Sequence, residues 1–81
     1  MNEELSRPGQ NVSESPLSIG AAVRQARRAH GLNQTQLAGL AGTGLRFISE
    51  LERGKPSVAL DKTLAVLAVL GLRIQISPAK Q

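Results

Sequence analysis

The stretch AGTGLRFISELERG, residues 41–54, decides the fold. Two glycines flank one threonine in it, and a helical apolar pattern follows at once. Gly42 can adopt the left-handed conformation that ends a helix, where a Cβ would cost about 1–2 kcal/mol. Gly44 can serve as the N-cap of the next helix. The stretch therefore predicts a tight turn, Gly42-Thr43-Gly44, between two short helices that cross steeply, which is the geometry of a helix-turn-helix.

The residues around this turn predict a mainly α domain. Apolar residues recur at spacings of three and four, which favours helices over residues 17–30, 34–41, 45–53 and 60–70. Asn33 and Gln36 form a variant of the capping box before the second helix. Gly31 and Gly54 follow the ends of the first and third helices. We expect residues 17–71 to form one compact four-helix domain.

The two ends of the chain have a different pattern. Residues 1–16 lack periodicity and are rich in Ser, Asn, Pro and Gly, which predicts a disordered tail. Residues 72–77 alternate apolar and polar side chains, which predicts a β-strand, and Pro78 ends it, leaving residues 78–81 as a tail.

A homodimer is the expected consequence of this C-terminal pattern. The last helix is apolar on nearly all sides, and the strand has no partner in its own chain. Two copies of the strand can pair antiparallel across a two-fold axis. A frayed tail packed on the last helix is the alternative. The expected interface residues are Leu67, Leu70, Leu72, Arg73, Ile74, Gln75 and Ile76.

Composition narrows the class of function. The net charge is +4, yet residues 1–15 are acidic overall, so the remaining 66 residues carry nine Lys/Arg against three acidic groups. A compact domain with this balance favours nucleic acid as a partner. The chain has no Cys and one His, and it has no phosphate-cradling loop, so we expect neither an enzyme nor a bound cofactor or metal. It has neither an apolar run of membrane-spanning length nor a signal peptide, which predicts a cytoplasmic, nucleoid-associated protein.

Residues 31–55, GLNQTQLAGLAGTGLRFISELERGK, resemble the core of the Cro/cI-type (XRE-family) helix-turn-helix DNA-binding domains. The resemblance lies in a Gln at the start of the second helix, Leu-Ala in its middle, Gly at the turn, then Ile-Ser and Glu-Arg-Gly-Lys. It implies a lambda-repressor-like fold that binds double-stranded DNA, with the third helix in the major groove. The terminal strand is similar to that of HipB-like antitoxins of type II toxin–antitoxin systems, where the strand pairs across a dimer.

The resemblance also implies which residues touch DNA. Arg46 would contact guanine, Glu50 would accept from cytosine N4, and Leu45 would touch a thymine methyl. Ser49 completes this base-reading set. The residues implied at the phosphate backbone are Gln34, Thr43, Gly44 and Leu45 through its amide, with Arg53 and Lys55 at the far end of the helix. The chain departs from the family at Gly44, where Ser or Thr is usual, and at Leu45, where a polar residue is typical.

The implied function is a sequence-specific transcriptional repressor that binds a palindromic operator as a homodimer. The HipB-like features imply an antitoxin that autoregulates its promoter and neutralises a HipA-like serine/threonine kinase toxin. A module that acts mainly through a protein partner, a phage-type repressor and a restriction–modification controller are the alternatives.

Several polar residues have more than one interpretation. The outward residues of the third helix can be an ordinary solvated face. Glu52 is expected to pair within the chain. The first helix carries Arg24, Arg27 and Arg28, which can be a solvated face, a phosphate clamp or a surface for an acidic partner. His30 is expected to be a favourable helix C-terminal residue rather than a ligand.

Overall fold

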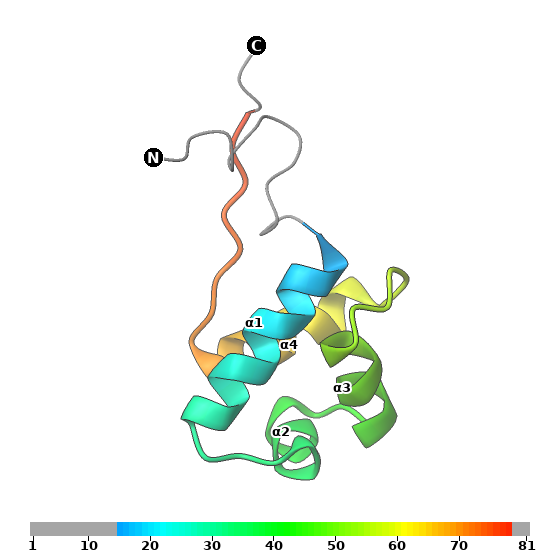
Figure 1. Ribbon diagram of the computed structural model, residues 1–81, viewed down its shortest axis with the longest axis vertical. Coiled ribbons are helices and arrows are strands. Elements are labelled where there is room, and N and C mark those ends of the chain that lie inside the picture. The colour runs from blue at the N-terminus through cyan, green and yellow to red at the C-terminus, as the bar shows by residue number, and fades with distance from the viewer. Residues whose placement is uncertain (1–14, 79–81) are drawn as a thin grey trace.

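Four helices pack around one core in the computed structural model, which describes residues 15–78 (Figure 1). They are α1 (Pro16–Ala29), α2 (Gln34–Ala41), α3 (Leu45–Glu52) and α4 (Leu60–Leu70). Each helix boundary lies within one residue of the range expected from periodicity. The predicted four-helix helix-turn-helix arrangement is confirmed. Residues 1–14 and 79–81, most of the two predicted tails, lie outside the described residues.

The start of α1 corrects the predicted tail boundary at residue 16. The Ser15 hydroxyl accepts from the backbone N–H of Ser18 at 3.1 Å, and the Ser18 hydroxyl in turn accepts from the backbone N–H of Ser15 at 3.2 Å. Pro16 occupies the first turn, where a missing N–H costs nothing. Ser15 and Pro16 therefore belong to the helix start, because a reciprocal cap and a proline define it.

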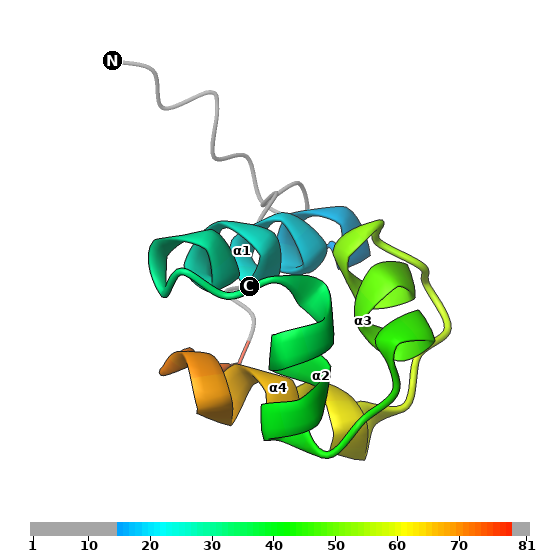
Figure 2. The ribbon, with the colours of Figure 1, turned by 90° about the horizontal axis from the view of Figure 1, so that it is seen from below.

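The core is aliphatic and draws on every helix. Val23, Leu37, Ile48 and Val66 are completely buried. The main helix contacts join α1 to α3, and α2 to both α3 and α4 (Figure 2). Helices of eight residues are too short to persist alone. The packed inner faces of α2 and α3 therefore hold these two helices in place.

The burial of α4 corrects part of the predicted dimer interface. Leu67 and Leu70 are 5% and 3% exposed within a single chain, so they have almost no surface to offer a second subunit. The reason is that α1 and α2 both contact α4 and cover its inner face. Leu60 and Leu64, nearer the start of the helix, remain exposed.

The C-terminal segment does not form a strand within the described residues. Gly71 has a φ of 73°, which ends α4 in the left-handed conformation, and the Leu72 N–H donates to Leu67 O at 2.9 Å. Leu72 packs on the core, whereas residues 73–78 are exposed and run away from the helices (Figure 1). The described part of one chain is therefore all-helical, because a strand requires a second strand to pair with.

Gly20 lets α1 approach α3 closely. A Cβ at Gly20 would overlap the carbonyl oxygen of Leu51 and lie 2.8 Å from that of Glu52. Gly39, in the middle of α2, has nothing within 4 Å of the same position. Of these two helical glycines, only Gly20 is required by packing within the chain.

Candidate nucleic-acid interface

The turn between α2 and α3 has the conformation that its glycines permit. Gly42 has φ 72° and ψ 32°, which is left-handed, and the Thr43 N–H donates to Ala38 O at 2.9 Å. Gly44 is extended, with φ −87° and ψ 159°, and is the N-cap of α3. Because Gly44 has no side chain, no side-chain hydrogen bond caps α3. The first N–H groups of α3 are therefore available to an external acceptor.

Five of the predicted DNA-contacting residues interact along α3 and the residues after it, in two separate groups. The Arg46 Nε lies 3.4 Å from Glu50 Oε2, and the Lys55 Nζ lies 3.3 Å from Glu50 Oε1. Arg53 Nη1 donates to Ser49 Oγ at 3.3 Å. The Arg46 side chain is 91% exposed. These side chains present hydrogen-bond donors and acceptors on the outer face of α3.

Glu50 is held ionised by its two partners, Lys55 and Arg46. Its pKa lies below the ordinary value, chiefly because of a hydrogen bond from Lys55. Partial desolvation opposes the shift, and the charges of Lys55 and Arg46 add to it. To accept from a base, the Glu50 carboxylate has to share or exchange these two cations. Arg46 and Lys55 likewise reach DNA only alongside, or instead of, their bonds to Glu50.

The front of α3 carries the remaining predicted contacts of the turn. Leu45 is 48% exposed, which leaves an apolar side chain at the start of the helix. Thr43 is half-buried, and its hydroxyl donates to Gly44 O at 3.4 Å. Both residues lie beside the uncapped helix start, so the predicted backbone contacts of the turn share one small area.

A buried ion pair joins α1 to α3 beneath this surface. Arg27 Nε lies 2.6 Å from Glu52 Oε2, Arg27 Nη2 donates to Glu52 Oε1 at 3.0 Å, and Arg27 Nη1 donates to Leu32 O at 2.8 Å. The side chains of Arg27 and Glu52 are 10% and 3% exposed. Glu52 therefore pairs within the chain, as expected. Of the three interpretations of Arg27, none fits, because the residue is buried against a carboxylate.

Arg27 was not predicted to be a core residue, although its spacing from the other buried residues of α1 indicates an inward position. It follows Val23 by four residues and Gly20 by seven, and all three are buried on the inner face of α1. Its charge favours a surface position when burial is judged by residue type alone. Glu52, the compensating partner, is 25 residues away in sequence.

Gln34 belongs to the same buried network. Its side-chain Nε2 donates to Glu52 Oε1 at 3.1 Å. Partial burial raises the pKa of Glu52, but hydrogen bonds from Arg27 and Gln34, together with the charges of Arg27 and Arg24, hold it below its ordinary value. The carboxylate therefore stays ionised and fixes the Gln34 amide at the first position of α2. One amide hydrogen of Gln34 is used inside the protein.

Within residues 15–78, His, Cys, Asp and Glu side chains do not cluster in threes that could hold a metal ion. None of the helices in the same range is both long enough and apolar enough to cross a membrane.

Known proteins with similar sequences have the same helix-turn-helix motif. A family model described as Helix-turn-helix matches residues 23–76. The chain is 51% identical over 63 residues to y4mF of Sinorhizobium fredii (strain NBRC 101917 / NGR234), an uncharacterized HTH-type transcriptional regulator. That match covers 78% of this chain and 83% of the relative.

Two kinds of solved structure are also similar. The HipB-O4 20mer complex matches with a TM-score of 0.71 and 27% identity, over 82% of this chain and 93% of that chain. A chain of the HipA-HipB-O2-O3 complex matches with the same TM-score and 26% identity. The restriction-modification controller protein C.AhdI of Aeromonas hydrophila matches with a TM-score of 0.64 and 31% identity, over 72% of this chain and 88% of that chain.

Proposed function

Because the chain belongs to the helix-turn-helix family of DNA-binding transcriptional regulators, which are not enzymes, we propose that it is a sequence-specific repressor. It binds a palindromic operator as a homodimer, with α3 of each subunit in the major groove and half-sites about 34–36 Å apart. It acts in the cytoplasm, where the nucleoid is. The observation that carries this proposal is the outer face of α3, where exposed Arg46 stands beside Leu45 and Ser49.

The contacts divide into base readers and phosphate binders. Arg46, Ser49, Glu50 and Leu45 read base edges, and Arg46 does so as a bidentate donor to guanine. The phosphate binders are Gln34, Thr43, Gly44, Leu45 through its amide, Arg53 and Lys55. The uncapped start of α3 supports this division, because its free amides suit a phosphate oxygen.

Replacing Arg46 or Ser49 with alanine is expected to weaken binding to the DNA upstream of the protein's own coding sequence. The loss should be on the order of 1–3 kcal/mol for each base contact. Fluorescence anisotropy against that DNA and a scrambled duplex measures it. Arg53→Ala is the matched control, because loss of a phosphate contact should weaken both duplexes equally. Equal affinity of the wild type for both duplexes would contradict the proposal of a sequence-specific repressor. It would favour a module that acts mainly through a protein partner.

The dimer is proposed to form through the C-terminal segment. Apolar and polar side chains alternate along Leu72, Arg73, Ile74, Gln75 and Ile76. Two of the apolar side chains are open to solvent, since Ile74 is 44% exposed and Ile76 is 93% exposed. Antiparallel pairing with a second copy would satisfy the backbone groups and cover both isoleucines. In Figure 1 this segment starts at the end of α4, on the side away from α3, and runs upward, away from the turn between α2 and α3. Pairing there leaves the outer face of α3 free.

A chain ending at Gly71 is therefore expected to be monomeric and still helical. The helices keep their own core, since Leu67 and Leu70 are buried within one chain. Sedimentation equilibrium and circular dichroism measure the two properties. A chain ending at Ser77 is the control and should remain dimeric. If the shorter chain dimerises as tightly as the longer one, the segment is not the interface.

Within this class we propose an antitoxin that represses its own operon and neutralises a HipA-like serine/threonine kinase. Similarity to HipB over 82% of the chain supports it. Co-purification with the product of the adjacent gene is the test, and a kinase bound to this protein is the expected result. A restriction enzyme encoded there instead would favour the controller role, to which the similarity with C.AhdI points.

A further inference from the structure

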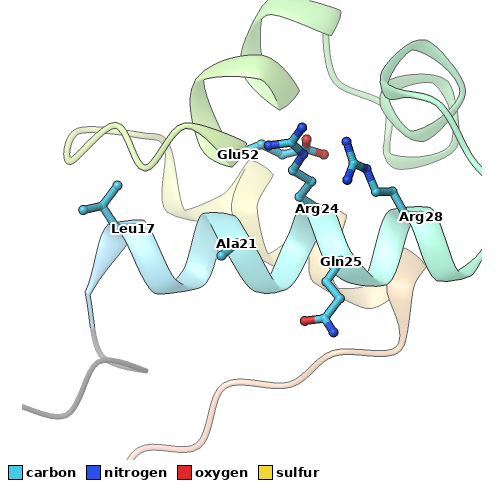
Figure 3. Close-up of a pocket in the computed structure, with 6 residues that line it drawn as sticks. All are labelled: Leu17, Ala21, Arg24, Gln25, Arg28 and Glu52. Carbon is cyan, nitrogen blue, oxygen red and sulfur yellow. The ribbon is translucent and has the colours of Figure 1, made fainter.

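An open pocket of about 470 Å³ lies between α1 and the end of α3 (Figure 3). It is lined by Leu17, Ala21, Arg24, Gln25, Arg28 and Glu52. Arg24 and Arg28 are four residues apart, so their side chains share one face of α1. Both point from α1 toward Glu52 in Figure 3. The pocket therefore holds two guanidinium groups above one carboxylate.

The two arginines leave a surplus of positive charge around Glu52, although the charge of Arg24 helps to lower the pKa of that carboxyl. The carboxylate of Glu52 already accepts from Arg27 and Gln34, and Arg27 balances its charge. Arg24 and Arg28 are exposed and make no ion pair within the described range. Two like charges held on one helix face are unfavourable unless an anion lies between them. The pocket consequently has the chemistry of an anion site with a net charge of about two.

The position of the pocket selects the anion. Gln34, at the first position of α2, reaches Glu52 at 3.1 Å, so the start of α2 adjoins the pocket. Arg53 directly follows Glu52 at the end of α3. Both residues are proposed phosphate binders. An anion at Arg24 and Arg28 would therefore lie next to the DNA backbone that these neighbours hold.

We propose that Arg24 and Arg28 together bind a phosphate of the DNA backbone, next to the one held at the start of α2. This inference rests on the proposed DNA-binding function and extends its footprint from α2 and α3 to α1. Arginine is suited to the role because its planar fork binds phosphate oxygens in pairs. The contact carries no sequence information and positions α3 in the groove.

The test is the salt dependence of DNA binding by an Arg24→Gln/Arg28→Gln variant. Each phosphate released lowers the slope of log K against log salt by about 0.9, so a dimer should lose about 1.8. Affinity for upstream and scrambled DNA should fall by the same factor. The Arg24→Lys/Arg28→Lys variant keeps both charges and should restore most of the slope. Thermal unfolding of each variant shows whether the fold is intact.

Lys62→Gln is the control, since it removes one exposed cation from α4, outside the proposed DNA and dimer contacts. Its salt slope should stay at the wild-type value. A loss of slope in Lys62→Gln half as large as in the double glutamine variant would overturn the site, because the number of charges removed would then explain both results. An unchanged slope in the double glutamine variant would also overturn it and point to an acidic protein partner. If wild-type protein shows no specific complex, the proposed function fails first, and the two failures are distinguishable.

Discussion

Replacing Glu52 with glutamine is expected to lower the free energy of unfolding by about 3 kcal/mol, as found when a buried ion pair loses one partner. Arg27 would remain buried with no carboxylate to neutralise it, since its side chain is only 10% exposed. The Gln34 amide would donate to a neutral amide oxygen in place of a carboxylate, which is a weaker hydrogen bond. Denaturant unfolding followed by circular dichroism measures the change. Stabilities of 5–15 kcal/mol are usual for domains, so the loss is a large fraction of the total.

Glu50→Gln is the matched control, because it removes an acid from the same helix with its ion pairs at the surface. Exposed pairs contribute little, so its unfolding curve should stay near that of the wild type. Comparable losses of unfolding free energy in the two variants would show that burial does not make the Arg27–Glu52 pair more stabilising than an exposed pair.

The pH dependence of stability follows from the same carboxylate. Folding lowers the pKa of Glu52 below its ordinary value of 4.5, so the unfolded state binds more protons in acid. The contribution of Glu52 is therefore present above its unfolded pKa and is lost as pH falls through the folded one. Stability measured from pH 7 down to pH 3 should fall less steeply for Glu52→Gln than for the wild type, and parallel curves would contradict this assignment.

Replacing Gly20 with alanine is expected to destabilise the fold by about 1–3 kcal/mol, the usual cost of overpacking. The new methyl group would meet the backbone carbonyls of Leu51 and Glu52, which cannot rotate away as a side chain would. Helix propensity alone favours alanine by about 1 kcal/mol, so the measured loss is net of that gain. Thermal or denaturant unfolding gives the value.

Gly39→Ala is the matched control for this substitution. The same change is made inside another helix, but nothing lies within 4 Å of the added carbon. Only the propensity term remains, so this variant should be more stable than the wild type by up to about 1 kcal/mol. Shifts of the same sign in the two variants would mean that the close approach of α1 and α3 does not govern stability.

The parts of the fold that depend on local physics were predictable from the sequence. Gly42 and Gly44 specify the turn because backbone sterics act within a residue or two. The helix boundaries followed from spacing and caps for the same reason. Fold class was therefore accessible without any knowledge of distant contacts.

The features that could not be predicted from the sequence depend on contacts between residues that are far apart in the chain or lie in another chain. Arg27 looks like a surface residue until Glu52 is placed against it. Leu67 and Leu70 look unburied until α1 and α2 are seen to cover them. The proposed C-terminal strand would need a second chain to pair with, which a single chain cannot provide. The outer face of α3 was predictable in composition, but the bonds that Glu50 makes to Arg46 and Lys55 were not.

The shared carboxylate of Glu52 also limits how this protein can change over evolutionary time. One side chain serves Arg27 on α1 and Gln34 on α2, so the three positions cannot drift independently. A lineage that exchanges Arg27 for an apolar residue must exchange Glu52 in the same step or pass through a less stable ancestor. Gln34, at the start of α2, is thereby inherited together with a buried ion pair.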